Sequence, residues 1–211
     1  MPDYRTQILY RFRNLQNQFL RKPDLKVKYQ EFMAELFRQN HASFAGPRKK
    51  DHSFYIPHFP VFGKSGKLRV VFDASAKYKE VSLNSRLLQG PDQLNNLFGV
   101  LLRWRRGQVA VNCDIQKMFH SFFVTKEDRE YLRFFWVKGD DPNGEPVECV
   151  ANVHIFGARS SPAVANFALR KAALLSGDRY CDEVKDFVFN NFYVDDGLLS
   201  ADSSIHHQRR S

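Results

Sequence analysis

Apolar residues recur every three to four positions over the first part of the chain, with basic and other polar residues between them. This spacing is typical of amphipathic α-helices. Two series share it: Ile8, Phe12, Leu15 and Phe19, then Leu25, Tyr29, Phe32 and Leu36 after Lys22-Pro23-Asp24. We therefore predict a helical segment over residues 1–50, with a polar loop from Ala45 onward at its end.

The pattern then changes to runs of aromatic and β-branched residues, at 54–62 and 68–73, separated by a glycine- and lysine-rich stretch at 63–67. This predicts a β-hairpin with a basic tip. Two interpretations of the tip stay open, because lysines keep an edge soluble and can also reach the phosphates of a nucleotide. Residues 74–107 predict a loop followed by a helix, whose apolar face comprises Leu94, Leu97, Phe98, Leu101 and Leu102.

Apolar runs in the second half of the chain end at acidic residues. The run 109–113 predicts a buried strand that ends at Asp114, and an acid buried there would need a metal, a cation or water as its partner. Further strands are predicted over 131–137 and 145–155, and a helix with Ser161 as N-cap and Pro162 at its first position. The run 184–194 and the apolar residues after Gly197 predict a hairpin with Asp195 and Asp196 at its turn.

Composition narrows the classes of function. The 211 residues are 43% hydrophobic and carry a net charge of +9, which predicts a folded domain with a polyanionic partner, nucleic acid before a membrane surface. Three scattered cysteines predict reduced core thiols; Cys149 and His154 have a spacing that could begin a zinc site, but no second pair follows. No apolar run approaches the roughly 18 residues of a membrane span, so we expect no membrane partner and an intracellular protein.

Several motifs follow one another in an order that identifies a family. The chain resembles the reverse transcriptases, and in detail the polymerase of Bel/Pao-type long-terminal-repeat retrotransposons. The resemblance covers essentially the whole chain. Its supporting stretches are Tyr55-Ile56-Pro57-His58, residues 67–77, 82–84 and 90–91, residues 114–119, the Gly-x-x-x-Ser-Pro start at 157–162, and Phe192-Tyr193-Val194-Asp195-Asp196.

The resemblance implies that Asp114, Asp195 and Asp196 are the catalytic carboxylates. They would bind two Mg²⁺ ions, or Mn²⁺, together with the main-chain carbonyl of Ile115. Two such ions, about 3.5–4 Å apart, activate the primer 3′-hydroxyl and stabilise the leaving pyrophosphate. Hard divalent cations take oxygen ligands, which explains why carboxylates serve here.

Further positions are implied to bind the incoming nucleotide. Arg69 corresponds to the arginine that grips the triphosphate and Asp73 to the acid four residues later; Lys64 is the nearest match for the fingertip lysine, with Lys67 left open. Phe119 lies where the family excludes a ribose 2′-hydroxyl, although a core aromatic is an equal alternative. At Phe156-Gly157, retroviral enzymes carry Gln before the glycine, so Phe156 is expected to stack or pack.

The implied fold is α+β, with right-hand polymerase fingers and a partial palm whose antiparallel sheet is backed by helices. We assign residues 1–50 to an N-terminal helical segment, 51–108 to a fingers-like region and 109–211 to the palm. The chain stops about fifteen residues after Asp196, so we expect the thumb and RNase H regions to be absent. Two functions stay open. One is an RNA-directed DNA polymerase fragment that adds deoxynucleotides to a primer on an RNA or DNA template; the other is an inactive retrotransposon-derived remnant that only binds nucleic acid.

Overall fold

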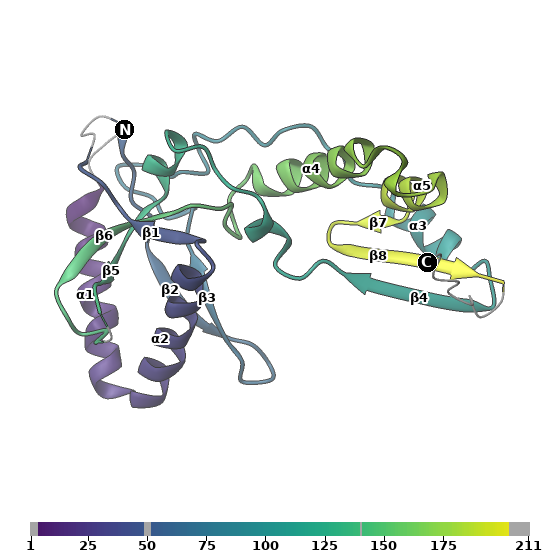
Figure 1. The fold of residues 1–211 in the computed structure, drawn as a ribbon. Helices are drawn as coiled ribbons and strands as arrows, with labels where there is room; N and C mark the ends of the chain where they lie inside the picture. The colour runs from purple at the N-terminus through teal and green to yellow at the C-terminus, as the bar shows by residue number, and fades with distance from the viewer. Residues whose placement is uncertain (1–3, 49–51, 140, 203–211) are drawn as a thin grey trace. The chain divides into compact units, whose positions relative to one another are not determined.

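The computed structural model describes residues 4–48, 52–139 and 141–202, and Figure 1 shows its helices and strands. The chain divides into two compact units, each built from two separate stretches of sequence. The first unit consists of Met1–Gln89 and Phe119–Ser161, and the second of Gly90–Met118 and Pro162–Ser211. The segment boundaries predicted near residues 50 and 108 stay a prediction.

Two amphipathic helices begin the first unit, as predicted. Helix α1 (Arg5–Arg21) packs against α2 (Pro23–Arg38), with only Lys22 between them (Figure 1). Pro23 takes the first position of α2, where its missing N–H leaves no hydrogen bond unmade. The buried side chains of the two helices are Ile8, Phe12, Leu15, Gln16, Phe19, Leu25, Tyr29, Met33 and Leu36.

Antiparallel strands make up two sheets in the first unit. One has the order β1-β6-β5, with β1 (Ala42–Phe44), β6 (Pro146–Ala151) and β5 (Arg133–Val137). The other is the predicted hairpin, formed by β2 (His58–Phe62) and β3 (Leu68–Phe72). Short 3₁₀ helices span Met118–Ser121 and Asp128–Leu132. Strand β1 has three residues, too few for a periodic signal, and was not predicted.

A neutral histidine lies inside the aromatic core of the first unit. Nε2 of His58 is 2.8 Å from the carbonyl oxygen of Phe135, and Nδ1 is 2.5 Å from the Tyr29 hydroxyl. A carbonyl oxygen only accepts, so Nε2 carries the hydrogen and Nδ1 accepts from Tyr29. Burial lowers the pKa of His58 to about 4, although the bond to Phe135 acts in the opposite direction. The imidazole is therefore neutral at neutral pH, with both ring nitrogens satisfied.

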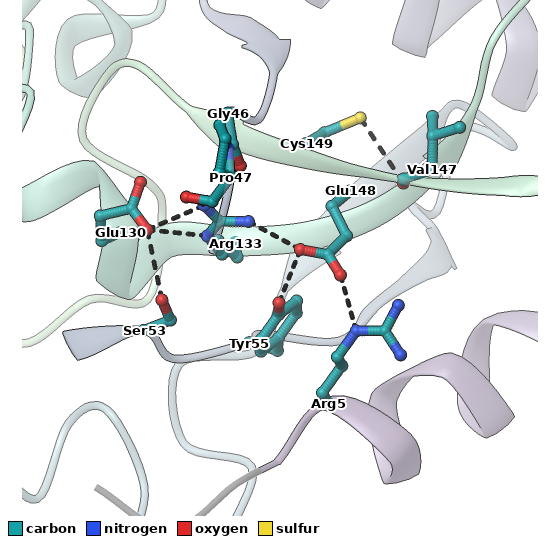
Figure 2. A network of polar contacts seen from close by, with 10 residues as sticks. All are labelled: Arg5, Gly46, Pro47, Ser53, Tyr55, Glu130, Arg133, Val147, Glu148 and Cys149. Carbon is teal, nitrogen blue, oxygen red and sulfur yellow. Dashed lines mark hydrogen bonds and ion pairs between the residues drawn. The ribbon is translucent and has the colours of Figure 1, made fainter. Parts of the chain in front are cut away.

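A fully buried arginine ties β5 to the loop after β1 (Figure 2). The Arg133 guanidinium donates to Oε2 of Glu130 at 2.9 Å and to Oε2 of Glu148 at 2.6 Å. It also donates to the main-chain carbonyls of Gly46 at 2.9 Å and Pro47 at 3.4 Å. A buried guanidinium needs such partners, because desolvating an unpaired charge costs several kcal/mol, about 3–5 when a partner is removed.

Glu148 joins this network to helix α1 (Figure 2). Its carboxylate accepts hydrogen bonds from Arg5 Nε at 2.6 Å and from the Tyr55 hydroxyl at 2.7 Å. Burial alone would raise the pKa of Glu148, but the bonds from Tyr55 and Arg5 and the charges of Arg5 and Arg133 outweigh it and hold that pKa below its ordinary value. No pattern in the sequence indicated this network, because its members come from separate elements.

The second unit is built around a three-stranded antiparallel sheet of order β4-β8-β7 (Figure 1). These strands are β4 (Val109–Asp114), β8 (Asp196–Ala201) and β7 (Phe192–Tyr193). Helices α3 (Leu97–Trp104) and α5 (Asp182–Asn190) both contact β7 and β8. Helix α4 (Ser161–Leu175) is followed by a 3₁₀ turn, Gly177–Arg179. The predicted N-cap, Ser161, is itself the first residue of α4, and its hydroxyl donates to the carbonyl of Ile155 at 3.0 Å.

The structure corrects the predicted strand over 184–194. Most of that run is helix α5, and only Phe192 and Tyr193 remain in a strand. Aromatic and β-branched residues favour strands locally. Here Asp182 and Glu183 occupy the first turn of the helix, where negative charge is favourable, and the apolar Val184 and Phe187 recur at helical spacing.

Burial in the second unit also differs from the prediction. Strand β4 was expected to be buried, but it lies at the edge of its sheet and is almost entirely exposed. The apolar face predicted for α3 is exposed as well: Phe98 is 70% exposed, and Val100 is the one buried residue of this helix. Hydrophobic periodicity located α3 but did not predict which of its faces the sheet covers.

The cysteines follow the prediction only in part. Cys149 is a buried core thiol, and burial raises its pKa to about 12. Cys113 and Cys181 were also expected in the core but are exposed. No helix within the described ranges is both long and apolar enough to cross a membrane.

Candidate active site

The two adjacent acids lie in a tight hairpin. Register pairs Phe192 with Gly197 and Tyr193 with Asp196, which leaves Val194 and Asp195 as a two-residue loop. Val194 has a φ of 58°, a left-handed conformation that costs a β-branched residue of order 1–3 kcal/mol. A hairpin with the acids at its turn is confirmed, although its first strand is only Phe192–Tyr193; Asp195 lies in the loop and Asp196 is the first residue of β8.

The third acid lies directly opposite this hairpin. Strand β4 pairs with β8 so that Asp114 faces Asp196, and the N–H of Ile115 donates to the carbonyl of Asp195 at 3.0 Å. Residues opposite each other in an antiparallel pair have Cα atoms about 4.5–5.5 Å apart and side chains on the same face. Two carboxylates 82 positions apart in the chain are thereby placed side by side at one end of the sheet.

Gly197 allows the two strands and the helix beside them to approach closely. A Cβ atom there would lie 2.6 Å from the Cys113 sulfur, 2.7 Å from the Phe192 ring and 2.9 Å from the Phe187 ring. Glycine is thus required for packing inside β8.

An asparagine that the sequence analysis did not single out fixes the base of the hairpin. Buried Asn191 donates from its side-chain amide to the carbonyl of Leu198 at 2.9 Å, and its own carbonyl accepts from the Leu198 N–H at 2.9 Å. Asn95 donates to the carbonyl of Phe192 at 2.8 Å. The position of a polar residue directly before the acidic hairpin was the one feature of the sequence that could have indicated the role of Asn191.

The carboxylates of Asp114 and Asp196 are suitable ligands for a divalent metal ion, which would need further ligands besides them. Asp114 and Asp196 are exposed, so the expectation that burial forces a partner on Asp114 is wrong. Among the residues that the structure describes, no three His, Cys, Asp or Glu side chains converge tightly enough to hold a metal by themselves. Mg²⁺ is commonly held by one or two carboxylates together with water and substrate phosphates, and an exposed pair of facing carboxylates meets that requirement.

The residues predicted to bind the nucleotide phosphates lie in the first unit, on or next to the β2–β3 hairpin. Lys64 and Lys67 are exposed in its loop, which the N–H of Gly63 closes by donating to the Lys67 carbonyl at 3.0 Å. Arg69 is exposed in β3. Asp73 accepts from the Ser75 N–H at 3.0 Å and so stabilises the turn after β3. The choice between Lys64 and Lys67 stays open.

The remaining predicted positions also belong to the first unit and lie together there. Phe119 and Phe156 meet edge to face, with ring centroids 4.6 Å apart, and Phe156 is 52% exposed. Gly157 has a φ of 88°, a conformation that favours glycine. Asn84 holds this turn by donating to the Gly157 carbonyl at 2.8 Å and accepting from the Arg159 N–H at 2.8 Å. Phe156 is therefore a packing partner of Phe119, and Asn84 positions the turn.

Comparison with solved structures defines the class of fold. The chain has the fold of a reverse transcriptase polymerase domain, a mixed α/β fold with antiparallel sheets. Comparison with protein-family models and with curated protein sequences finds no match.

Three of the similar structures come from foamy viruses. A foamy viral protease-reverse transcriptase in complex with double-stranded DNA aligns with a TM-score of 0.61 and 21% identity, over 84% of this chain and 26% of that one. A selenomethionine-labelled mutant of the prototype foamy virus protease-reverse transcriptase aligns with a TM-score of 0.60 and 20% identity, over 86% of this chain and 20% of that one. The native prototype foamy virus enzyme aligns with a TM-score of 0.56 and 20% identity, over 81% of this chain and 19% of that one. The chain therefore spans about a quarter or less of the length of these proteins.

Proposed function

We propose that the chain is the fingers and part of the palm of an RNA-directed DNA polymerase, of the type found in Bel/Pao retrotransposons. The observation that carries the proposal is the register of β4 and β8, which places Asp114 opposite Asp196 with Asp195 in the adjoining loop. The fold shared with the foamy virus enzymes supports it.

The proposed chemistry assigns each acid a task. Asp114, Asp195 and Asp196 would hold two divalent ions, which supply activation of the primer 3′-hydroxyl and stabilisation of the leaving pyrophosphate when bound. The strand register brings the main chains of Asp114, Asp195 and Asp196 together, which supports carboxylates that would be close to each other before a substrate arrives. The main-chain carbonyl of Ile115 would add a further oxygen. Preorganised ligands lower the barrier because they need not rearrange during the reaction.

The substrates belong to the same proposal. Arg69 and one of the two loop lysines would contact the triphosphate, since guanidinium and ammonium groups bind phosphate oxygens strongly. Phe119 would favour deoxynucleotides by excluding a 2′-hydroxyl. The primer-template would be RNA or DNA, and double-stranded DNA is the partner present in one of the similar structures.

A second candidate function is nucleic-acid binding without catalysis. The first unit contains 22 Lys and Arg against 14 Asp and Glu, a balance of +8, so it carries almost all of the chain's net charge. A unit with such a charge balance would bind polyanions by counterion release, with an affinity that falls steeply as salt rises. This binding requires none of the three acids.

The test is primer extension on poly(rA)/oligo(dT) with Mg²⁺ or Mn²⁺. We expect incorporation by the wild-type chain and at least a hundredfold loss in Asp114→Asn and in Asp195→Asn/Asp196→Asn, the order of effect typical for a missing electrostatic catalytic group. Asp186→Asn is the matched control, since Asp186 is an exposed acid of α5 outside the site.

Incorporation that is equal in all four proteins would overturn the assignment of the acids. If none of them incorporates nucleotide but all bind the primer-template with the same salt dependence, the second function is correct.

A further inference from the structure

An open pocket of about 460 Å³ lies in the first unit, away from the residues proposed for catalysis and nucleotide binding. Its walls come from the end of β1 and the loop after it, and from the facing ends of β5 and β6; the side chains that matter are Phe44, Arg48, Lys138, Val147 and Glu148. Sites for small organic ligands commonly have volumes of roughly 300–1,000 Å³. None of the predicted catalytic or nucleotide-binding residues lines this pocket.

The charge of the pocket is positive. Arg48 and Lys138 line it, and Lys138 is exposed and makes no ion pair with any residue of the described ranges. The one carboxylate in the wall, Glu148, is already neutralised by Arg5 and Arg133 (Figure 2). Two cations therefore face an incoming ligand without an opposing charge from Glu148, which favours an anion.

Hydrogen bonds hold the backbone immediately before Arg48. The carbonyls of Gly46 and Pro47, immediately before Arg48, both accept hydrogen bonds from buried Arg133 (Figure 2). The Arg48 guanidinium lies 5.7 Å from the centre of the Tyr55 ring. A cation that follows a hydrogen-bonded backbone segment loses less conformational entropy when it binds a ligand than one that follows an unheld segment.

An aromatic ring borders the same pocket. Phe44 is 50% exposed, and its ring is stacked on Phe37 with centroids 5.2 Å apart and planes inclined by 28°. The stack supports the ring from one side, and the exposed half of Phe44 is available to a planar group. A ring of this kind beside two cations is the combination by which proteins bind single-stranded nucleic acid, with bases stacked on aromatic rings and phosphates on basic side chains.

We propose that this pocket binds one nucleotide of a single-stranded nucleic acid, with the base on Phe44 and the phosphate between Arg48 and Lys138. A duplex does not fit the same chemistry, because its bases are already stacked on each other. The balance of +8 on this unit supports a polyanionic partner over an acidic peptide of few charges. The inference shares its nucleic-acid partner with the proposed function but requires no catalysis.

The experiment measures binding of fluorescein-labelled oligo(dT) by fluorescence anisotropy as a function of salt. Phe44→Leu keeps an apolar side chain against Phe37 and should weaken binding about five- to tenfold without altering the salt dependence. Arg48→Ala/Lys138→Ala should reduce the slope of log K against log salt by about 1.4, the value for two phosphate contacts on a single strand. Lys22→Ala/Lys28→Ala removes two exposed cations of the same unit, one between α1 and α2 and one in α2, and is the matched control.

A second readout locates the base directly. Photocrosslinking with oligo(dT) that carries 5-iodouracil should attach the base to Phe44, and mass spectrometry of the digest identifies the residue. The crosslink should persist in Asp195→Asn/Asp196→Asn. If the wild-type chain crosslinks at Phe44 but gives no primer extension, the polymerase proposal fails and the pocket inference stands.

Three results would overturn the inference. The first is a crosslink found only at other residues. The second is a control variant that weakens binding as much as the pocket variants do. The third is a poly-glutamate peptide whose binding depends on Arg48 and Lys138 while oligo(dT) binding does not, which would assign the pocket to an acidic protein partner.

Discussion

The buried imidazole of His58 makes the stability of the first unit depend on pH. Its pKa is about 4 in the folded protein against 6.5 for a free histidine. Between these values the unfolded chain binds a proton that the folded chain does not, so stability falls as pH is lowered from 6.5 towards 4. Each pKa unit corresponds to about 1.36 kcal/mol, so the full loss is about 3 kcal/mol, of which about 1 kcal/mol occurs between roughly pH 7.5 and 5.5.

The assay is urea unfolding at several pH values, followed by the fluorescence of Trp136, whose ring lies 6.2 Å from that of His58. A Trp104→Phe background removes the other tryptophan. His58→Gln replaces the imidazole by an amide that does not titrate and still donates a hydrogen bond. The variant should be less stable at neutral pH but should lose the part of the pH dependence due to His58.

The control is His52→Gln, because His52 is an exposed histidine of the same unit. Burial also lowers the pKa of His154, so His154 contributes to the pH dependence of stability in the wild type. The difference between the wild type and His58→Gln isolates the contribution of His58. Equal slopes between pH 6.5 and 4 in wild type and His58→Gln would refute the reasoning.

Two further substitutions test the packing. Arg133→Met should destabilise the first unit by about 3–5 kcal/mol in urea unfolding, because it leaves Glu148 with fewer partners in the interior; a loss below about 1 kcal/mol would show that the network contributes little. Gly197→Ala should cost about 1–3 kcal/mol through overpacking and should also abolish primer extension, because the added Cβ has no space between the strands and α5. Gly99→Ala, in helix α3, should be neutral or stabilising in thermal unfolding.

Local patterns predicted the elements whose signals are long and periodic. Helices α1 and α2 and the β2–β3 hairpin lie where the spacing of apolar residues placed them. Helix α5 was mistaken for a strand because its nine residues are rich in aromatic and β-branched types, and so short a run does not separate the two periods. Strand β1 gave no signal.

Long-range pairing was beyond the reach of those patterns. The sequence identified Asp114 and the Tyr-x-Asp-Asp motif separately, and a resemblance connected them; the direct pairing of Asp114 with Asp196 is a property of the β4–β8 register. The burial of Arg133 could not be predicted, because nothing in the sequence distinguishes its partners Glu130 and Glu148 from exposed charged residues. The exposure of β4 follows from its place at a sheet edge, which the chain order does not reveal.

The central claim is that Asp114, Asp195 and Asp196 form one divalent-metal site, and a Mn²⁺ titration tests it most directly. Electron paramagnetic resonance measures the free ion as protein is added, with and without a deoxynucleoside triphosphate. We predict binding that the nucleotide strengthens, because its phosphates supply additional oxygen ligands, and that falls about tenfold or more in Asp114→Asn and Asp196→Asn but not in Asp186→Asn. Equal Mn²⁺ binding by the wild-type chain and all three variants would contradict the account.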